Sequence, residues 1–476
     1  MSTSTERLSG NLSTFKIVMM VVAAAAPLGA VVGIIPIAMA IGSGSSMPAV
    51  FVLTGVLLLC FAVGYAAMAR RMSAAGGFYT YVAQGLGRPA ALAAAVVAIG
   101  AYLALTLLLV ASVGNFGTIV ATLLIGHEIP WWVFAGVALA CVAVMGVREI
   151  TIAGNVLAVM LGVELLAILV LVVAIIVHRG AGAFPAQAMN PAHLFTPGSF
   201  GLGFMFALTT FIGFESAAIY SEESQDSRRS VPRATYIAVL VIAGFYALTT
   251  WVVVGAVGTG NVEAVASKKL SGLVFGLSNE FATGLLTKIM YVATLTSLFS
   301  ALLALHNATS RYLFSISREG ALLPVSLGRT HPKHDTPARA SLTVTAVCVL
   351  VSLVFAVIGA DPYLNMLTIM TGIGTLGIVV LQALAAAAII AYFWRTARSG
   401  AGVLIGSAIG LIAFVAAAVL IVQNFKTLSG ATSDWINVLP YALLGAAVIG
   451  GLRGWWLRSR RPEKYARIGT YGEFGE

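Results

Sequence analysis

Twelve long apolar segments divide the chain, and they constrain its fold more than any other feature. A helix needs about 20 consecutive apolar residues to cross the hydrocarbon core of a bilayer. The connections between the segments are too short to hold a soluble domain. The segments are residues 17–41, 48–69, 89–113, 130–147, 152–178, 200–221, 234–257, 284–309, 340–360, 364–393, 402–424 and 435–457. The sequence therefore predicts an all-α integral membrane protein with 12 transmembrane helices.

The charges support this interpretation and give a topology. Charged residues make up only 9% of the 476 residues, against about 25% in soluble domains. The net charge of +10 could indicate nucleic acid, but 22 of the 27 lysines and arginines fall in the tails and alternate loops. The positive-inside rule then predicts a multi-pass protein of the cell (cytoplasmic) membrane with both termini in the cytoplasm. The expected macromolecular partner is the lipid bilayer, with no nucleic acid.

The residues needed for metal binding or catalysis do not cluster in the sequence. Cys60, Cys141 and Cys348 lie apart within apolar runs and form neither a disulfide framework nor a metal-binding spacing. Of the six histidines, His306 is the one inside a membrane segment, since His178 is the last residue of segment 5, and no nucleophile has a base at a plausible spacing. We therefore expect no metal, no cofactor and no enzymatic activity.

Segments 1 and 6 are interrupted by residues that weaken a helix. Segment 1 contains Pro27, Gly29, Gly33 and Pro36, and segment 6 contains Gly213. Either interruption alone is weak evidence, because glycine and proline are common in membrane helices. Two interruptions five helices apart are typical of an inverted repeat with a ligand site between the breaks. Freed N–H groups there suit a carboxylate, and freed carbonyls suit an ammonium group or a cation.

Two carboxylates lie inside predicted membrane segments, Glu215 in segment 6 and Glu164 in segment 5. A charged side chain at the bilayer centre costs roughly 2.5–3.5 kcal/mol, so such residues usually face a cavity or a partner. Glu215 is therefore a candidate for the core of the site and for a proton-linked step. The alternative is a structural carboxyl that accepts hydrogen bonds from neighbouring backbone.

Three groups of motifs resemble those of the amino acid–polyamine–organocation (APC) permeases, and with the topology they cover nearly the whole chain. The first follows segment 2, the second spans segment 6 and its exit, and the third follows segment 8. The matching residues are Gly76–Tyr81; Phe211–Glu215, Glu222-Glu223 and Arg229–Ala234; and Ser310–Phe314, Arg318–Pro324 and Thr336–Ala340. Each group is a weak signal alone, but the three in this order are specific.

The resemblance implies the LeuT-type fold, in which ten core helices form a 5+5 inverted repeat with helices 1 and 6 interrupted, plus two peripheral helices. It also implies secondary-active, alternating-access transport of a small molecule, an amino acid or a related amine or polyamine. The expected parts are a cytoplasmic N-terminal tail (1–16), a transport core (17–393) with helices 1–5 (17–178) and 6–10 (200–393), peripheral helices (402–457) and a cytoplasmic C-terminal tail (458–476).

The resemblance places the substrate between the two breaks, with the break of helix 1 at Gly29–Gly33. To these residues the sequence adds Tyr102 and Thr106, whose i, i+4 spacing puts them on one helix face. The expected substrate-binding residues are Gly29, Ala30, Val31, Val32, Gly33, Tyr102, Thr106, Thr210, Phe211, Ile212, Gly213, Phe214 and Glu215. Phe211 and Phe214 are candidates to cover the substrate, although phenylalanine in a membrane helix more often packs in the core.

This chain departs from the family pattern in two ways. Val31 stands where many relatives have a second glycine, which favours a substrate other than a standard α-amino acid. Segment 5 lacks the lysine that replaces a sodium ion in proton-coupled relatives. The coupling candidates are therefore H+ at Glu215 or Glu164, or Na+ at hydroxyls of segment 8 such as Thr296 and Ser297, and uncoupled exchange is a further alternative.

The charged run Glu222–Arg229 ends segment 6. Its acids could pair with Arg70, Arg71, Arg311 or Arg318 to close an inner gate, although most such runs are solvated loops. An ion channel or a membrane enzyme are the competing classes. The first is disfavoured because no filter-like loop or ring of charges is present.

Overall fold

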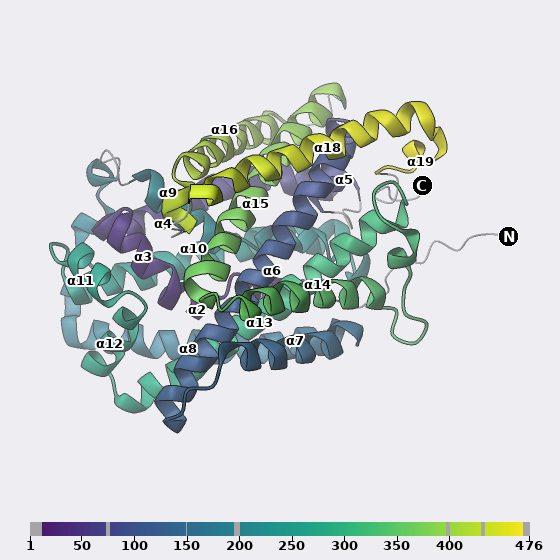
Figure 1. Ribbon diagram of the computed structural model, residues 1–476. Coiled ribbons are helices and arrows are strands. Elements are labelled where there is room, and N and C mark those ends of the chain that lie inside the picture. Colours follow the sequence, from purple (N-terminus) through teal and green to yellow (C-terminus); the bar gives the residue numbers. More distant parts are fainter. Residues whose placement is uncertain are drawn as a thin grey trace.

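The computed structural model describes residues 12–72, 77–148, 150–194, 200–396, 400–429 and 434–469, and its regular elements there are helices (Figure 1). Residues 1–11 of the N-terminal tail, Gly76 of the first motif and residues 470–476 lie outside the described residues. The helices are α1 (Thr14–Ala24), α2 (Pro27–Gly33), α3 (Ile35–Ile41), α4 (Met47–Ala69), α5 (Phe78–Gly85), α6 (Arg88–Ile125), α7 (Trp131–Val147), α8 (Ile150–Arg179), α9 (Phe200–Phe211), α10 (Ser227–Val257), α11 (Val262–Lys269), α12 (Gly272–Phe281), α13 (Gly284–Arg318), α14 (Ala338–Val357), α15 (Thr368–Thr396), α16 (Ala401–Gln423), α17 (Phe425–Ser429), α18 (Leu439–Arg460) and α19 (Pro462–Ala466).

Each predicted segment has a helical counterpart. Within the described residues, 11 spans are long and apolar enough to cross a bilayer, and α7, with 17 residues, is a shorter twelfth helix. Segment 2, predicted at 48–69, is α4 (Met47–Ala69). The largest extensions are in α6 and α13, which continue well past residues 113 and 309 to Ile125 and Arg318. The apolar segments coincide with helices because a chain that crosses lipid must be apolar along its length. It must also pair its backbone polar groups within itself, which a helix does.

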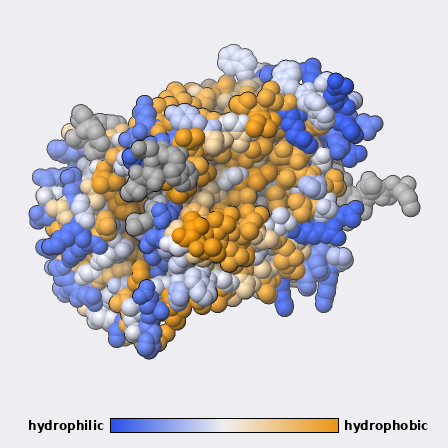
Figure 2. All heavy atoms as spheres, viewed as in Figure 1, coloured by the Kyte–Doolittle hydropathy of each residue, from blue (hydrophilic) through white to orange (hydrophobic). Residues whose placement is uncertain are grey.

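The outer surface is largely apolar, as expected for helices in contact with lipid. Exposed leucine, valine and isoleucine side chains occur along α8, α14, α16 and α18. Figure 2 shows the hydrophobic surface in the middle of the molecule and hydrophilic residues gathered toward its two ends. An apolar surface of this extent in a soluble monomer would mark an interaction site. Here it indicates the part of the protein that the membrane covers.

Helix 1 is broken, but four residues earlier than the motif comparison placed the break. The prediction of a break at Gly29–Gly33 is wrong, because these residues form the continuous helix α2. The chain leaves α1 after Ala24, Ala26 takes a left-handed conformation (φ 45°), and α2 starts at Pro27. Proline has no N–H and fits the first turn of a helix, whereas glycine alone does not stop one. A smaller irregularity at Ile34 separates α2 from α3.

Helix 6 is broken at the predicted glycine. Helix α9 ends at Phe211, Gly213 has φ +119°, and the chain continues as the tight turn η5 (Phe214–Ala218). Such a backbone conformation is accessible to glycine and strained for other residues. Both interrupted helices lie in the interior, since 83% of the apolar stretch of each is buried, against 22% for α18. The most irregular backbone of the bundle is thus enclosed by protein rather than lipid.

Candidate functional site

The two breaks touch each other at the centre of the bundle. A Cβ atom added to Gly213 would lie 2.8 Å from the Cβ of Ala24, the last residue of α1. A cavity of about 380 Å³ adjoins this contact and is lined by both interrupted helices together with α6, α13 and α15. This volume is at the lower end of the range of about 300–1,000 Å³ that is usual for small-molecule sites.

Five of the expected binding residues line this cavity. They are Gly29, Ala30, Gly33, Thr210 and Ile212. On α2, the first three share a face because they follow an i, i+1, i+4 spacing. Val31 and Val32 point to the opposite side of the same helix and are buried in the core. Sequence alone could not distinguish these two faces, since every residue of α2 is apolar.

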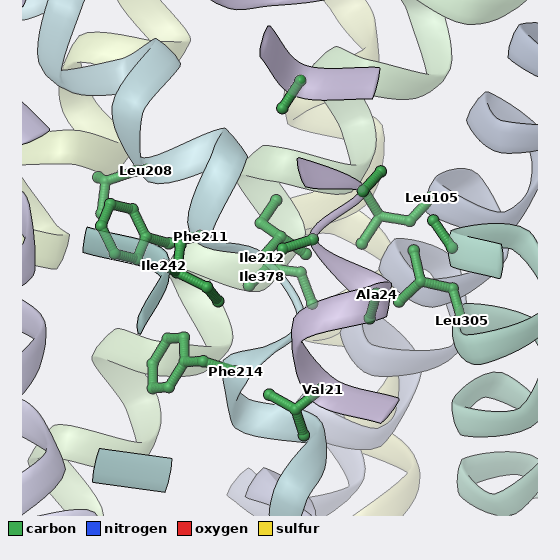
Figure 3. Packing of buried hydrophobic residues seen from close by; sticks show 14 of the residues in the cluster. Val21, Ala24, Leu105, Leu208, Phe211, Ile212, Phe214, Ile242, Leu305 and Ile378 are labelled. Carbon is green, nitrogen blue, oxygen red and sulfur yellow. The ribbon is translucent and has the colours of Figure 1, made fainter. Parts of the chain in front are cut away.

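Phe211 and Phe214 do not reach the cavity in this structure. Phe211 packs against Phe51 and Tyr246, with ring centroids 6.4 and 6.3 Å apart, and Phe214 packs against Phe61 at 6.3 Å. Figure 3 shows both rings on one side of the helix-6 chain, whereas Ile212 lies on the side of Ala24 and Leu305. The turn at Gly213 thus directs these rings toward α4 and α10, and a role in covering the substrate stays a prediction.

Glu215 is buried behind the helix-6 break and does not line the cavity. Its Oε2 accepts a hydrogen bond from the Gly213 N–H at 3.0 Å, and its Oε1 accepts one from the Tyr102 hydroxyl at 3.2 Å. Its backbone carbonyl accepts a bond from the Tyr65 hydroxyl at 2.6 Å. Thr106, one turn from Tyr102, contacts Thr309 at 3.0 Å and also lies outside the cavity. Tyr102 and Thr106 therefore connect helices within the bundle.

Glu164 of α8 occupies the break of helix 1. Its Oε2 accepts a hydrogen bond from the Leu28 N–H at 3.2 Å, while its Oε1 is buried without a hydrogen-bond partner. Ser297 of α13 also faces this carboxylate and accepts a bond from the Gly29 N–H at 3.3 Å. Thr296, expected beside Ser297, lines a shallow outer groove instead, because adjacent helical residues point in different directions. The hydroxyl of Thr296 bonds its own helix at the Ala293 carbonyl, 3.0 Å away.

Two buried ion pairs tie helix 6 to the end of α13. The Arg311 guanidinium contacts both oxygens of Glu223, at 2.5 and 2.8 Å, and Arg318 contacts Glu222 at 2.7 Å. Two of the four proposed arginine partners are thus confirmed as pairing with these acids. The Leu12 N–H donates to the Glu223 carbonyl at 2.9 Å, so the residues just before helix 1 also contact this part of the bundle. We call this part of the bundle the closed end.

The C-terminal segment covers the same end. The Gly469 N–H donates to Glu319 Oε1 at 2.9 Å, and the Tyr79 hydroxyl donates to the other oxygen of this carboxylate. Arg88 donates to the Ala466 carbonyl at 3.1 Å and lies over the Tyr465 ring. Burial raises the pKa of Glu319 from its ordinary 4.5 to about 7, although the bonds from Tyr79 and Gly469 and the nearby arginines Arg318 and Arg88 oppose this change.

Several residues that line the cavity were not among the expected binding residues. They are the hydroxyl residues Ser112, Thr209, Thr368, Thr371 and Thr427 and the aromatic residues Phe116, Phe206 and Tyr363. Thr368 and Thr371 are spaced i, i+3 at the start of α15, so their shared face was a usable signal. The remaining positions follow from which helix faces the breaks, and a single sequence does not contain that information.

Sequence comparison relates the chain to transporters. A profile of the amino acid permease family matches residues 12–449. The low-affinity putrescine importer PlaP of Escherichia coli K12 is 23% identical over 314 residues, covering 64% of this chain and 66% of that protein. The human Asc-type amino acid transporter 1 is 28% identical over 205 residues, covering 41% of this chain and 38% of that protein. The matches thus span 66% or less of the length of these relatives.

Comparison of structures supports the expected fold. A manganese transporter of Eremococcus coleocola superposes with a TM-score of 0.63 at 12% identity, covering 98% of this chain and all of that protein. At this identity the likeness concerns the fold alone. It agrees with the LeuT-type arrangement expected from the motifs, whose interrupted helices 1 and 6 are both present here. The profile match over most of its length shows that this chain belongs to the amino acid permease family, within the APC superfamily.

Proposed function

We propose that this protein is a secondary transporter that moves an amino acid or a related amine across the membrane by alternating access. The observation that carries the proposal is the cavity beside the two helix breaks. It reaches the end of the bundle at Leu270, Tyr363 and Thr427, while the opposite, closed end is sealed by the buried pairs of Glu222 and Glu223. A central site open to one side only is what alternating access requires.

Reconstitution of the purified protein into liposomes tests this function. A thermal-shift screen of amino acids and amines first identifies ligands, because a molecule that binds only the folded state stabilises it. A carrier then gives saturable uptake of the ligand that is accelerated by unlabelled ligand on the other side. Unsaturable ion current would instead indicate a channel, and a chemically altered product would indicate an enzyme.

For the orientation, we propose that both termini are cytoplasmic, so that the cavity faces the outside. The distribution of lysine and arginine along the chain supports this assignment. A single cysteine placed at Arg467, in a variant without native cysteines, should react with a membrane-impermeant reagent only after the cells are opened. Labelling in intact cells would show that the termini lie outside and that the proposed orientation is reversed.

For the coupling, Glu164 is the stronger of the two carboxylate candidates. Both oxygens of Glu215 have hydrogen-bond partners, whereas Glu164 has a buried oxygen with none and contacts the broken backbone of helix 1. Loss or gain of a proton at Glu164 would therefore change the support of that break. The alternative is a sodium ion near Ser297, whose hydroxyl lies at the same place. Uptake with sodium replaced by potassium, under an imposed pH gradient, distinguishes the two.

A further inference from the structure

Three backbone N–H groups at the breaks are already bonded to side chains of the protein. The Leu28 and Gly29 N–H groups of helix 1 donate to Glu164 and Ser297 at 3.2 and 3.3 Å. In helix 6, the Gly213 N–H donates to Glu215 at 3.0 Å. These are the donors that a substrate carboxylate would need at the breaks. Glu164, Ser297 and Glu215 thus occupy three positions where a carboxylate of the ligand would otherwise bind.

Three backbone carbonyls at the breaks, in contrast, lack a hydrogen-bond donor from the described backbone. In a continuous helix, the Ala24 carbonyl would accept from the Leu28 N–H, which instead bonds Glu164. Among the described residues, no backbone N–H is found on the carbonyls of Ala24, Thr210 or Ile212, and all three residues line the cavity. The C-terminal ends of α1 and α9 also bring the negative ends of two helix dipoles here. Acceptors without donors in a membrane interior favour a ligand that donates.

The charges around the cavity also favour a ligand that carries a positive charge. Among the residues that the structure describes, none of those lining the cavity is a lysine, arginine, histidine, aspartate or glutamate. Behind the breaks lie Glu164 and Glu215, neither of which forms a salt bridge within the described part of the chain. A carboxylate entering this cavity would find no cation, and an unpaired buried charge is costly. An ammonium group would find carbonyl acceptors and two nearby carboxylates.

The remainder of the wall is apolar or carries neutral hydroxyls. Leu105, Leu108, Leu298 and Leu305 face the cavity from α6 and α13, and Phe206 and Phe116 add aromatic surface. This wall suits a hydrocarbon or aromatic body attached to the ammonium group. A second ammonium group, as in a linear diamine, would lie among apolar side chains and neutral hydroxyls. The lining residues that the structure describes offer no carboxylate to balance its positive charge.

We propose that the substrate is a monoamine with an apolar body and no carboxylate, held by its ammonium group at the carbonyls of the two breaks. The proposal rests on the transport function proposed above and narrows its substrate class. Glu164 and Glu215 act in it as specificity-determining residues, because they satisfy the N–H groups that would recognise an amino acid and supply negative charge for an amine.

Matched pairs of ligands that differ only by the carboxylate test the proposal. 3-Methylbutylamine is compared with leucine, and 2-phenylethylamine with phenylalanine, in thermal shift and in counterflow with the reconstituted full-length protein. We expect the amine of each pair to bind and exchange at concentrations lower by on the order of tenfold or more, which is about 1.4 kcal/mol of binding free energy. 1,4-Diaminobutane should be weaker than either monoamine.

The outcomes separate this inference from the transport function. Exchange of leucine or phenylalanine that equals or exceeds that of the matched amine overturns the substrate class and leaves the carrier function standing. Preference for the diamine also overturns it. If well-folded protein exchanges none of these compounds and no ligand from the thermal-shift screen of amino acids and amines, the transport function itself is contradicted.

Neutralised variants test the role of the two carboxylates independently. Glu164→Gln and Glu215→Gln keep an oxygen that can accept the N–H of the break but remove the negative charge. We expect each to weaken amine binding several-fold while the unfolding temperature without ligand stays close to that of the parent. Glu128→Gln, in an exposed loop, is the matched control and should bind like the parent. Unchanged amine affinity in both variants would contradict the assigned role.

Discussion

The breaks of helices 1 and 6 lie against each other but are maintained in different ways. The helix-6 break is local, because Gly213 supplies the left-handed backbone and Glu215, two residues later, accepts the freed N–H. The helix-1 break depends on distant parts of the chain, because its freed N–H groups bond Glu164 of α8 and Ser297 of α13. Tyr102 of α6 and Tyr65 of α4 also bond Glu215. The acceptor of the freed Gly213 N–H nevertheless comes from the helix-6 segment itself, whereas both acceptors at the helix-1 break come from other helices.

This difference has a consequence for the transport proposed above. A break that is supported from neighbouring helices changes when those helices move or when their side chains change protonation. A break that is capped within its own turn moves as a unit. Helix 1 is therefore the half of the pair that we expect to respond to coupling, and helix 6 is the half that provides a fixed reference.

Loss of the ion pair that holds the exit of helix 6 to α13 at the closed end should have the largest effect. Glu223→Ala leaves Arg311 buried without its partner and removes the charge that holds α13 to the exit of helix 6. Breaking a buried ion pair in this way costs about 3–5 kcal/mol. We expect a lower unfolding temperature and increased labelling of cysteines placed at this end.

The control for this variant is Asp226→Ala. Its partner Arg229 and Asp226 itself are exposed, at 76% and 52% of their side-chain surface. Exposed pairs contribute about 0–1 kcal/mol, so stability should change little. Equal effects of the two variants would mean that the buried pair does not hold the closed end.

Disruption of the local break at Gly213 should be next in size. Gly213→Ala imposes φ +119° on a residue with a side chain and directs its Cβ to within 2.8 Å of Ala24. Backbone strain of this kind costs about 1–3 kcal/mol, and the contact with helix 1 adds to it. We expect reduced stability and loss of ligand binding, measured by thermal shift. Gly244→Ala, where no atom lies within 4 Å of the added Cβ, should behave like the parent protein.

Exchange of each glutamate for glutamine compares the two breaks directly. Glu164→Gln preserves an acceptor for Leu28 but cannot release or take up a proton, so pH-gradient-driven accumulation should be lost while counterflow continues. Glu215→Gln should retain its dependence on the pH gradient, because helix 6 is capped within its own turn. The measurement is uptake into liposomes with and without an imposed pH gradient. The reverse result would assign the coupling to helix 6.

The smallest effect is expected at Glu319, which lies at the closed end beyond both breaks. Its pKa is raised by burial to about 7, so docking of the C-terminal segment binds a proton that the undocked carboxylate releases. Docking is then strongest below pH of about 4.5 and weakens as pH rises through about 7. A fluorophore pair between α5 and residue 467 should report separation over this range. Glu319→Gln should remove the dependence, and persistence of it there would assign the titration to another group.

Much of the architecture could be predicted from local sequence. The apolar runs located the spans, as α4 and α7 illustrate, because in lipid each helix must be apolar along its own length. The break at Gly213 was also visible, since glycine is the residue that tolerates its backbone conformation. The break of helix 1 was misplaced because the comparison relied on glycines, whereas Pro27, which lacks an N–H, starts the new helix.

The sequence by itself therefore determined the membrane class, the spans and the local break of helix 6, all of which depend on residues close together in the chain. The tertiary structure decided which side chains reach the cavity and what supports helix 1. Glu164 and Leu28 are 136 residues apart, and their hydrogen bond forms only when α8 packs beside the interrupted helix. The orientation of a side chain around an entirely apolar helix, as with Gly29 and Val31, likewise depends on the helices that surround it.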